Sequence, residues 1–285
     1  MIRQARIIAS YTLLEALRNR LMWLVALVAL IGIGLSGFLG EIAITESRQV
    51  QVALLAAFLR FSAVFLLATF VVTSMVRESN DKGLELVLAL PLPRASYLFG
   101  KLAGFAALAL VPAVLFGLLT TLFTPPAQAA LWTLSLIAEL WLVAAFSLLC
   151  VLTFNQILPT LSAVMAFYLL ARSIATIQLI GKGPLSDNTL AQRVMSFVID
   201  SIAALLPRLD NFAKSDWLVY HSGAWSALTP LAGQTASYLA LLTGAALFDL
   251  YRKNLSICAK DRSPPYPNLP CCYWPWASAC RSPGT

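Results

Sequence analysis

The chain has 285 residues, of which 59% are hydrophobic and only 12% carry a charge, and its mean hydropathy is +0.79. A soluble domain is about 45–50% apolar and about 25% charged, so this composition excludes an ordinary soluble protein and predicts an integral membrane protein. The net charge of +7 does not predict a nucleic-acid partner, because the basic residues are scattered between apolar runs and form no patch with aromatic residues.

Residues 1–20 are expected to form a helix, because they contain neither Gly nor Pro and are rich in Leu, Ala and Arg. Their four arginines favour a position beside anionic lipid headgroups on the cytoplasmic side of the membrane. The apolar run that follows is not expected to be a cleaved signal peptide, since it begins only after 20 residues and lacks a small-x-small cleavage site.

Six apolar segments are long enough to cross a hydrocarbon core, which requires about 20 residues. Backbone groups in lipid must be hydrogen-bonded within their own segment, so each segment is expected to be a helix. Pro112 lies inside the third segment and is expected to kink that helix rather than end it. The six expected spans are 21–39, 52–76, 102–123, 131–154, 158–179 and 231–248.

The basic residues of the short flanking segments predict the orientation of these spans. They concentrate before the first span, between the second and third, and after the sixth, whereas the opposite short loops, 40–51 and 124–130, hold only Arg48. Both termini and residues 76–101 are therefore expected in the cytoplasm. Residues 180–230 then form the one large extracytoplasmic element, in which residues 190–206 can form a helix along the outer membrane surface.

Residues 257–285 differ from the membrane domain, residues 1–256, because they hold six prolines and four of the five cysteines. One interpretation is a metal site, although the cysteine spacing matches no common zinc pattern. The other is a disordered or accidental extension, which we favour. The four cysteines are Cys258, Cys271, Cys272 and Cys280.

The chain carries no recognisable catalytic motif. Gly100-Lys101 and Gly181-Lys182 lack the earlier glycine and the following hydroxyl of a phosphate-binding loop. His221 is the single histidine, which excludes a His-rich metal centre and leaves no support for a Ser-His-Asp triad. We therefore expect no catalytic residue, metal or cofactor in this chain, and energy for any transport from a partner or an ion gradient.

Three ionisable residues lie within the expected spans: Arg60, Glu139 and Arg172. Such residues are costly in a bilayer and are candidates for function. Counted along their helices, the three can meet in the outer half of the bundle. Glu139 is expected to pair with Arg172 or Arg60 and to line an outward-facing cavity, or the pair only fixes the packing of the helices.

Residues 76–101 are a charged segment between two apolar spans, yet their middle is strongly apolar from Leu84 to Leu90. Exposed apolar surface of this kind is typical of a docking site for a partner. A short helix is expected from about Asp81 to Leu90, ended by Pro91 and Pro93. Glu78 and Glu85 are expected to meet basic side chains of the partner, and Lys101 is expected to extend outward at the membrane interface.

The same segment carries the pattern E-x4-G-x7-P-x2-R-x5-G-K, and it resembles membrane subunits of ATP-binding-cassette (ABC) transporters of the type-2 permease class. Residues 1–20, LLPRLDNF at 205–212 and FDLYRKNL at 248–255 are similar to the same family. The resemblance is closest to the subgroup linked to maturation of multi-copper enzymes, and it covers residues 1–256. The pattern consists of Glu78, Gly83, Pro91, Arg94, Gly100 and Lys101.

The resemblance implies an all-α permease with six transmembrane helices that dimerises with a second copy of itself or a homologous permease and binds two ABC ATPase subunits. The ATPases would bind ATP and Mg. Residues 1–20 would be an interfacial helix, and the segment between spans two and three a coupling helix. The expected ATPase-coupling residues are Glu78, Gly83, Leu84, Glu85, Val87, Leu88, Pro91 and Arg94.

Such a subunit would lie in a bacterial cytoplasmic membrane and take part in export. The alternative hypothesis is an ion-coupled secondary transporter that uses Glu139, Arg172 and Arg60. A membrane-integral enzyme is disfavoured by the single histidine and the missing catalytic motifs.

Overall fold

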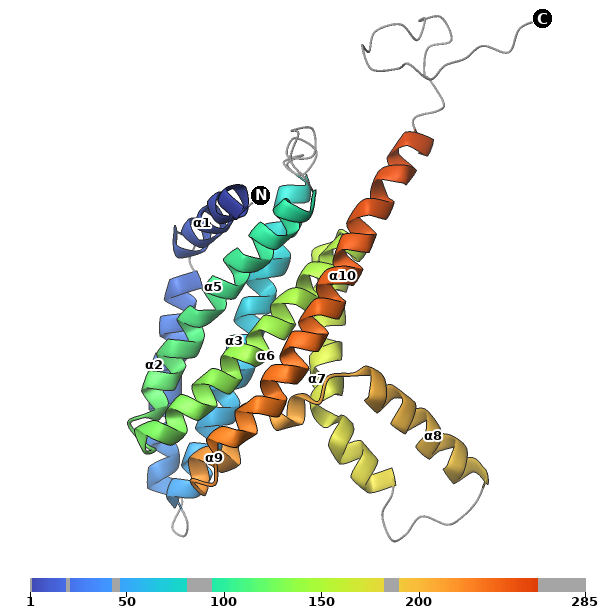
Figure 1. The fold of residues 1–285 in the computed structure, drawn as a ribbon. Coiled ribbons are helices and arrows are strands. Elements are labelled where there is room, and N and C mark those ends of the chain that lie inside the picture. The colour runs from blue at the N-terminus through green and yellow to red at the C-terminus, as the bar shows by residue number, and fades with distance from the viewer. Residues whose placement is uncertain (1, 19–20, 43–46, 81–93, 182–189, 261–285) are drawn as a thin grey trace, which may run out of the picture.

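The computed structural model describes residues 2–18, 21–42, 47–80, 94–181 and 190–260, and these ranges contain helices and turns but no strand (Figure 1). Six of the helices are long and apolar enough to cross a membrane, as the sequence predicts. They are α2 (Leu21–Ile42), α3 (Ser47–Asn80), α5 (Arg94–Thr120), α6 (Pro126–Phe154), α7 (Ile157–Gly181) and α10 (Leu228–Lys260).

Most helix boundaries lie beyond the ends of the expected spans, and one lies inside them. The third span was expected to continue to residue 123, but α5 ends at Thr120, and a turn leads to Pro125 and to Pro126 at the start of α6. Proline suits a first helical turn because its missing N–H has no helical acceptor there. Pro112 does lie inside α5, as expected. At the other end of the chain, α10 continues past residue 256 to Lys260.

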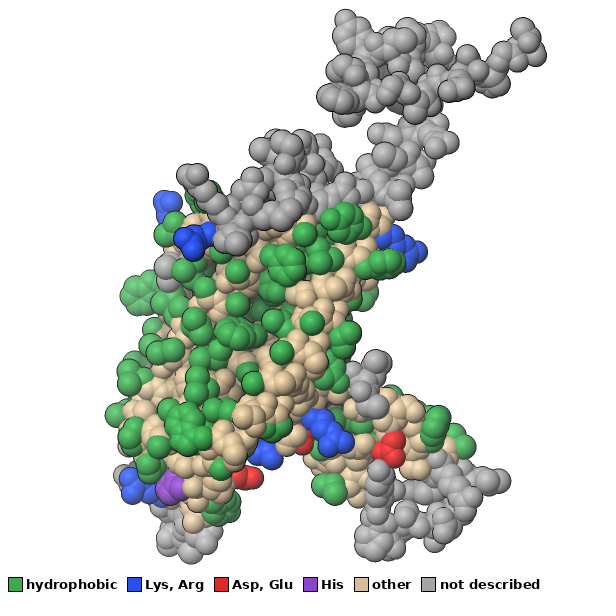
Figure 2. All heavy atoms as spheres, in the orientation of Figure 1, with side chains coloured by type: hydrophobic (Ala, Val, Ile, Leu, Met, Phe, Trp, Pro, Cys, Tyr) green, Lys and Arg blue, Asp and Glu red, His purple; other side chains and the backbone are tan. Residues whose placement is uncertain are grey.

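Helix α6 occupies the centre of the bundle and packs against α3, α5, α7 and α10. Its buried face carries Trp132, Leu136 and Leu140, none of which is exposed to solvent. Figure 2 shows hydrophobic side chains over the length of the bundle and charged ones gathered near its two ends. This distribution is the one that a bilayer favours, because charged groups stay near water while apolar ones face lipid.

Helix α1 (Ile2–Arg18) crosses the bundle at the end where both chain termini lie, and it packs mainly against α5 (Figure 1). A glycine allows this close approach. A Cβ atom on Gly104 would lie 2.8 Å from the Cβ of Thr12 and 3.2 Å from the carbonyl oxygen of Ala9. The expectation of a helix in residues 1–20 is therefore confirmed, and its contact surface is the face of α5 around Gly104.

The connection between α7 and α10 holds α8 (Leu190–Leu205), η1 (Leu209–Asn211), α9 (Ser215–Val219) and η2 (Trp225–Ala227). Helix α8 confirms the helix expected at 190–206 and pairs with α7, where the Gln178 side-chain amide donates to Asp200 Oδ1 at 2.9 Å. Its apolar residues Val194, Met195 and Phe197 are exposed.

Replacing Gly104 should separate α1 from the bundle. Replacing Gly by Ala inside a helix stabilises the folded protein by about 1 kcal/mol. Overpacking at a close backbone contact destabilises it by about 1–3 kcal/mol. We expect Gly104→Ala to lower the thermal unfolding midpoint of the detergent-purified protein. Gly233→Ala in α10 is the matched control, because a Cβ there meets no atom within 4 Å and should leave the midpoint unchanged or raise it. Equal shifts in both variants would contradict this packing.

Candidate functional site

The three ionisable residues predicted to meet inside the bundle do converge. Arg60 lies in α3, Glu139 in α6 and Arg172 in α7, each within a candidate spanning helix. The Nη1 atom of Arg172 lies 3.8 Å from Glu139 Oε1, so the expected pairing of Glu139 with an arginine is present. Glu139 is completely buried, which means that it does not line a water-accessible cavity in this conformation.

The two arginines direct their donors mainly at backbone carbonyls. Arg172 Nη1 donates to the carbonyl oxygens of Leu209 and Phe212, and Arg60 Nη1 donates to that of Ala213 at 2.8 Å. The acceptors belong to residues 206–214, which we call the anchored loop. Two arginines and one carboxylate leave a surplus of donors, and the loop carbonyls supply the additional acceptors.

Helix α6 holds the anchored loop from another side. Trp132 Nε1 donates to the carbonyl oxygen of Ala213 at 3.2 Å, and the backbone N–H of Ala213 donates to Ser135 Oγ at 2.8 Å. Ala213 has a φ of 41°, a left-handed conformation that costs energy for a residue with a Cβ. Leu209, Phe212 and Ala213 are fully buried, so the loop is inserted between α3, α6 and α7.

This insertion was not predicted from the sequence. Residues 180–230 were expected to form one large extracytoplasmic element, whereas the structure buries Leu209, Phe212 and Ala213 in the bundle. Trp132, Ser135 and Ala213 were not among the predicted site residues. The sequence feature that could have indicated the insertion is the excess of arginines over carboxylates within the spans, because the additional arginine needs acceptors from elsewhere in the chain.

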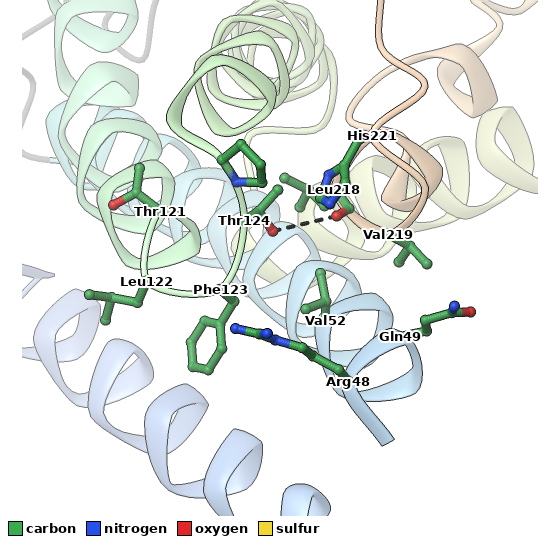
Figure 3. Close-up of a pocket in the computed structure, with 11 residues that line it drawn as sticks. Arg48, Gln49, Val52, Thr121, Leu122, Phe123, Thr124, Leu218, Val219 and His221 are labelled. Carbon is green, nitrogen blue, oxygen red and sulfur yellow. Dashed lines mark hydrogen bonds between the residues drawn. The ribbon is translucent and has the colours of Figure 1, made fainter. Parts of the chain in front are cut away.

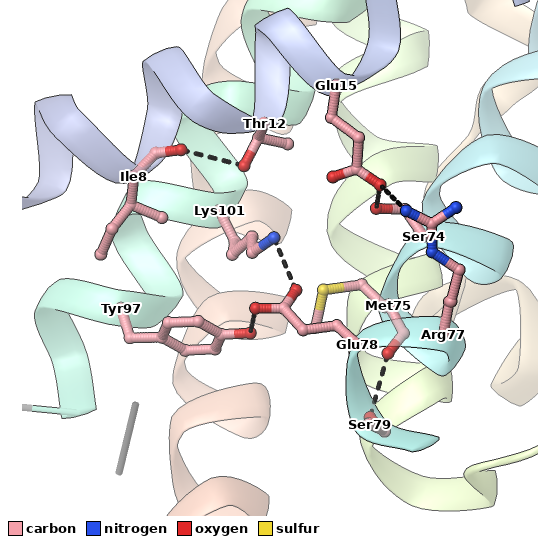
Figure 4. Close-up of polar contacts among 10 residues, drawn as sticks. All are labelled: Ile8, Thr12, Glu15, Ser74, Met75, Arg77, Glu78, Ser79, Tyr97 and Lys101. Carbon is pink, nitrogen blue, oxygen red and sulfur yellow. Dashed lines mark hydrogen bonds and ion pairs between the residues drawn. The ribbon is translucent and has the colours of Figure 1, made fainter. Parts of the chain in front are cut away.

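A second polar cluster lies at the opposite end of α3 and joins α1, α3 and α5 (Figure 4). Lys101 Nζ lies 2.6 Å from Glu78 Oε2, and the Tyr97 hydroxyl donates to Glu78 Oε1 at 2.9 Å. Glu15 of α1 accepts a hydrogen bond from Ser74 at 3.2 Å and lies 3.6 Å from Arg77 Nη2. We call this the flanking cluster: Glu15, Ser74, Arg77, Glu78, Tyr97 and Lys101.

The flanking cluster corrects one expectation. Lys101 was expected to extend outward to the membrane interface, but it is only 6% exposed because Glu78 and α1 cover it. Glu78, whose expected contact with a partner stays a prediction, binds Lys101 and Tyr97 of the same chain, which was not predicted. Arg94 is the first residue of α5. The helix expected at 81–90 and the remaining expected coupling residues lie outside the described residues: Gly83, Leu84, Glu85, Val87, Leu88 and Pro91.

Neither polar cluster has the composition of a metal centre. In the described ranges no group of three or more His, Cys, Asp or Glu side chains could hold a metal ion. Cys271, Cys272 and Cys280 of the possible tail site lie outside those ranges.

A comparison of the sequence with protein-family models finds no match, and a comparison with curated proteins finds none either.

Removing the Arg172 side chain should release the anchored loop. Arg172→Met leaves the Phe212 carbonyl without a donor, the Leu209 carbonyl with only the Phe212 N–H, and Glu139 without its nearest cation. Breaking a buried charge pair costs about 3–5 kcal/mol. We expect a lower thermal unfolding midpoint in detergent and faster proteolysis within residues 206–214.

The control is Arg208→Gln, which removes an exposed arginine of the same loop and should change neither readout. Adding Glu139→Gln to Arg172→Met should recover part of the loss, because the unpaired buried charge is then gone. Similar behaviour of Arg172→Met and Arg208→Gln would contradict the anchoring role.

Proposed function

We propose that this chain is the membrane-spanning permease subunit of an ABC transporter, which moves its substrate by alternating access while a separate subunit hydrolyses ATP. The six spanning helices, the family-like pattern around residues 78–101 and the missing nucleotide-binding motif support the proposal. The main support is the flanking cluster, because it connects α3 and α5 on either side of residues 81–93, the segment that a partner would contact.

Residues 81–93 connect the end of α3 to the start of α5. Glu78 lies near that end of α3, and Tyr97 and Lys101 lie in the first turns of α5. A short charge-assisted contact shielded from water holds its geometry more firmly than an exposed pair. A push on residues 81–93 would therefore move α3 and α5 together. The contacts of Glu15 with Ser74 and Arg77 would transmit the same movement to α1.

At the other end of the bundle, the anchored loop would close the substrate path in one state of the proposed alternating-access cycle. Five hydrogen bonds with side chains of α3, α6 and α7 hold three loop residues, Leu209, Phe212 and Ala213. Displacing α3 against α6 would strain these bonds, since Arg60 and Trp132 share the Ala213 carbonyl. The loop would then leave the bundle and open it.

The proposal includes the remaining features expected of this family. Both termini and residues 81–93 would face the cytoplasm of a bacterial cell, and transport would be export. The working unit would hold two permease subunits, either two copies of this chain or this chain with a homologous one, together with two ATPase subunits. The chain itself would hold no cofactor, while its ATPases bind ATP and Mg.

The second candidate is an ion-coupled secondary transporter, and one observation favours it. The carboxylate of Glu139 is completely buried, and it interacts with Arg172, Arg60 and the Tyr168 side chain. An intramembrane carboxylate can take up a proton and then lose its attraction for Arg172. Transport by the purified chain in vesicles, driven by a proton or sodium gradient without ATP, would select this candidate over the first.

Deleting residues 84–90 tests the partner. The full chain should purify in a stoichiometric complex that hydrolyses ATP, and the deletion should remove the ATPase while the permease stays folded, since its described helices do not include these residues. Size-exclusion chromatography with an ATPase assay reports both results. A complex that survives the deletion, or a full chain that carries no ATPase activity, would refute the proposed coupling segment.

Lys101→Met should uncouple the two activities. Glu78 would lose its buried cation, and the ends of residues 81–93 would move independently of each other. We expect ATP hydrolysis to persist while substrate moved per ATP falls about tenfold, which corresponds to about 1.4 kcal/mol.

Arg6→Gln is the matched control, because it removes an exposed basic residue of α1 at the same end of the bundle. The charge exchange Glu78→Lys with Lys101→Glu should restore part of the coupling. Unchanged coupling in Lys101→Met would show that the flanking cluster does not transmit force.

A further inference from the structure

A cavity of about 440 Å³ lies at the end of the bundle that is remote from the chain termini (Figure 3). The start of α3 forms one wall with Arg48, Gln49 and Val52. The turn between α5 and α6, residues 121–125, forms a second wall, and the end of α9 with His221 after it forms the third. The wall formed by residues 218–221 is joined to the turn by the hydrogen bond from Thr124 Oγ1 to the Leu218 carbonyl, at 3.5 Å. We call this cavity the end pocket.

The charges of the end pocket all have one sign. Arg48 and His221 are the ionisable side chains among its described lining residues, and none of these residues is acidic. Figure 3 shows the Arg48 side chain extending toward Phe123 across the gap between α3 and the turn. Arg48 is exposed and lines the pocket, so its guanidinium can donate to a group that enters it.

The end pocket also has a defined depth relative to the apolar spans. The candidate span of α3 begins at Arg48, that of α5 ends at Thr120, and that of α6 begins at Pro126. Lining residues 48 and 121–125 thus lie where three spans begin or end, which is the level of lipid headgroups. Basic side chains at this level commonly contact the phosphates of anionic lipids.

The surface beside the pocket is apolar and unoccupied by other described helices. Leu118, near the end of α5, and Leu122, in the turn that follows it, are each 68% exposed. Val50 and Leu54 of α3 are also exposed. An acyl chain that leaves the pocket toward the bundle would meet these side chains. A free inorganic anion would use only the basic residues and would leave this apolar surface bare.

We propose that the end pocket binds the phosphate of an anionic phospholipid, with its acyl chains along Leu118 and Leu122. The Arg48 guanidinium donates two parallel hydrogen bonds to the phosphate oxygens, a geometry that suits this side chain. The His221 imidazole donates a further hydrogen bond. The proposal does not depend on the transport function, because it rests on the cavity, its charge and its position at the ends of the spans.

Native mass spectrometry of the purified full-length chain tests this site with phosphatidylglycerol as the probe. We expect Arg48→Gln to bind this lipid about tenfold more weakly than the unchanged chain, as loss of a charge-assisted contact predicts. Arg48→Lys should fall between the two, because it keeps the charge but not the paired donors. Arg208→Gln, which removes an exposed arginine outside the pocket, should bind as the unchanged chain does.

Two further arms identify the source of the phosphate. Diacylglycerol with the same acyl chains should fail to occupy the site, and inorganic phosphate in large excess should fail to displace phosphatidylglycerol. Displacement by inorganic phosphate would overturn the lipid proposal and show that the site binds a free anion. Equal lipid binding by Arg48→Gln and the unchanged chain would overturn the site, as would an equal loss in Arg208→Gln, which would indicate only general attraction. Equal thermal unfolding midpoints in lipid-free detergent confirm that the Arg48 variants are folded.

Discussion

Two arginines inside a helical bundle must find acceptors there, and this requirement determines where the anchored loop lies. Arg60 and Arg172 lie near one completely buried carboxylate, that of Glu139, and Arg172 also interacts with the partly buried Asp210. A guanidinium taken out of water is costly unless its N–H groups are paired. The carbonyls of Leu209, Phe212 and Ala213 supply further acceptors, and the arginines in turn donate to the Phe212 and Ala213 carbonyls, which accept no backbone hydrogen bond in the described residues. Each partner makes the burial of the other possible.

The two polar clusters use different chemistry at the two ends of one helix. The flanking cluster pairs a lysine with a carboxylate, whereas the anchored loop is held by arginines on carbonyl dipoles. Helix α3 contributes Glu78 to the first and Arg60 to the second, 18 residues apart and so about 27 Å along the axis. Because α3 is one uninterrupted helix, a displacement at Glu78 would be carried to Arg60 as a rigid-body movement. The proposed transport cycle requires such a connection between the two ends.

The sequence predicts the helices of this chain better than their polar contacts. Span lengths follow from uninterrupted apolar runs, so all six long helices could be predicted, and the convergence of Arg60, Glu139 and Arg172 followed from their depth. The acceptors in the anchored loop could not be predicted, because main-chain carbonyls leave no mark on the residue pattern. Lys101 was misplaced for a related reason. A lysine near a helix end can extend to water or bury itself on a carboxylate, and only the position of α1 decides between them.

The long contact between Glu139 and Arg172 would have a role in the proposed transport cycle. In this conformation Arg172 lies 3.8 Å from the carboxylate and directs its hydrogen bonds to the loop. If the loop left the bundle, as the proposal requires, the same guanidinium would lose its carbonyl acceptors and could close the short distance to Glu139. A donor that always has one of two acceptors keeps the two states close in energy, as a reversible gate requires. A fully hydrogen-bonded Glu139 would favour the open state too strongly, and an apolar side chain at 139 would leave Arg172 unpaired whenever the loop is out.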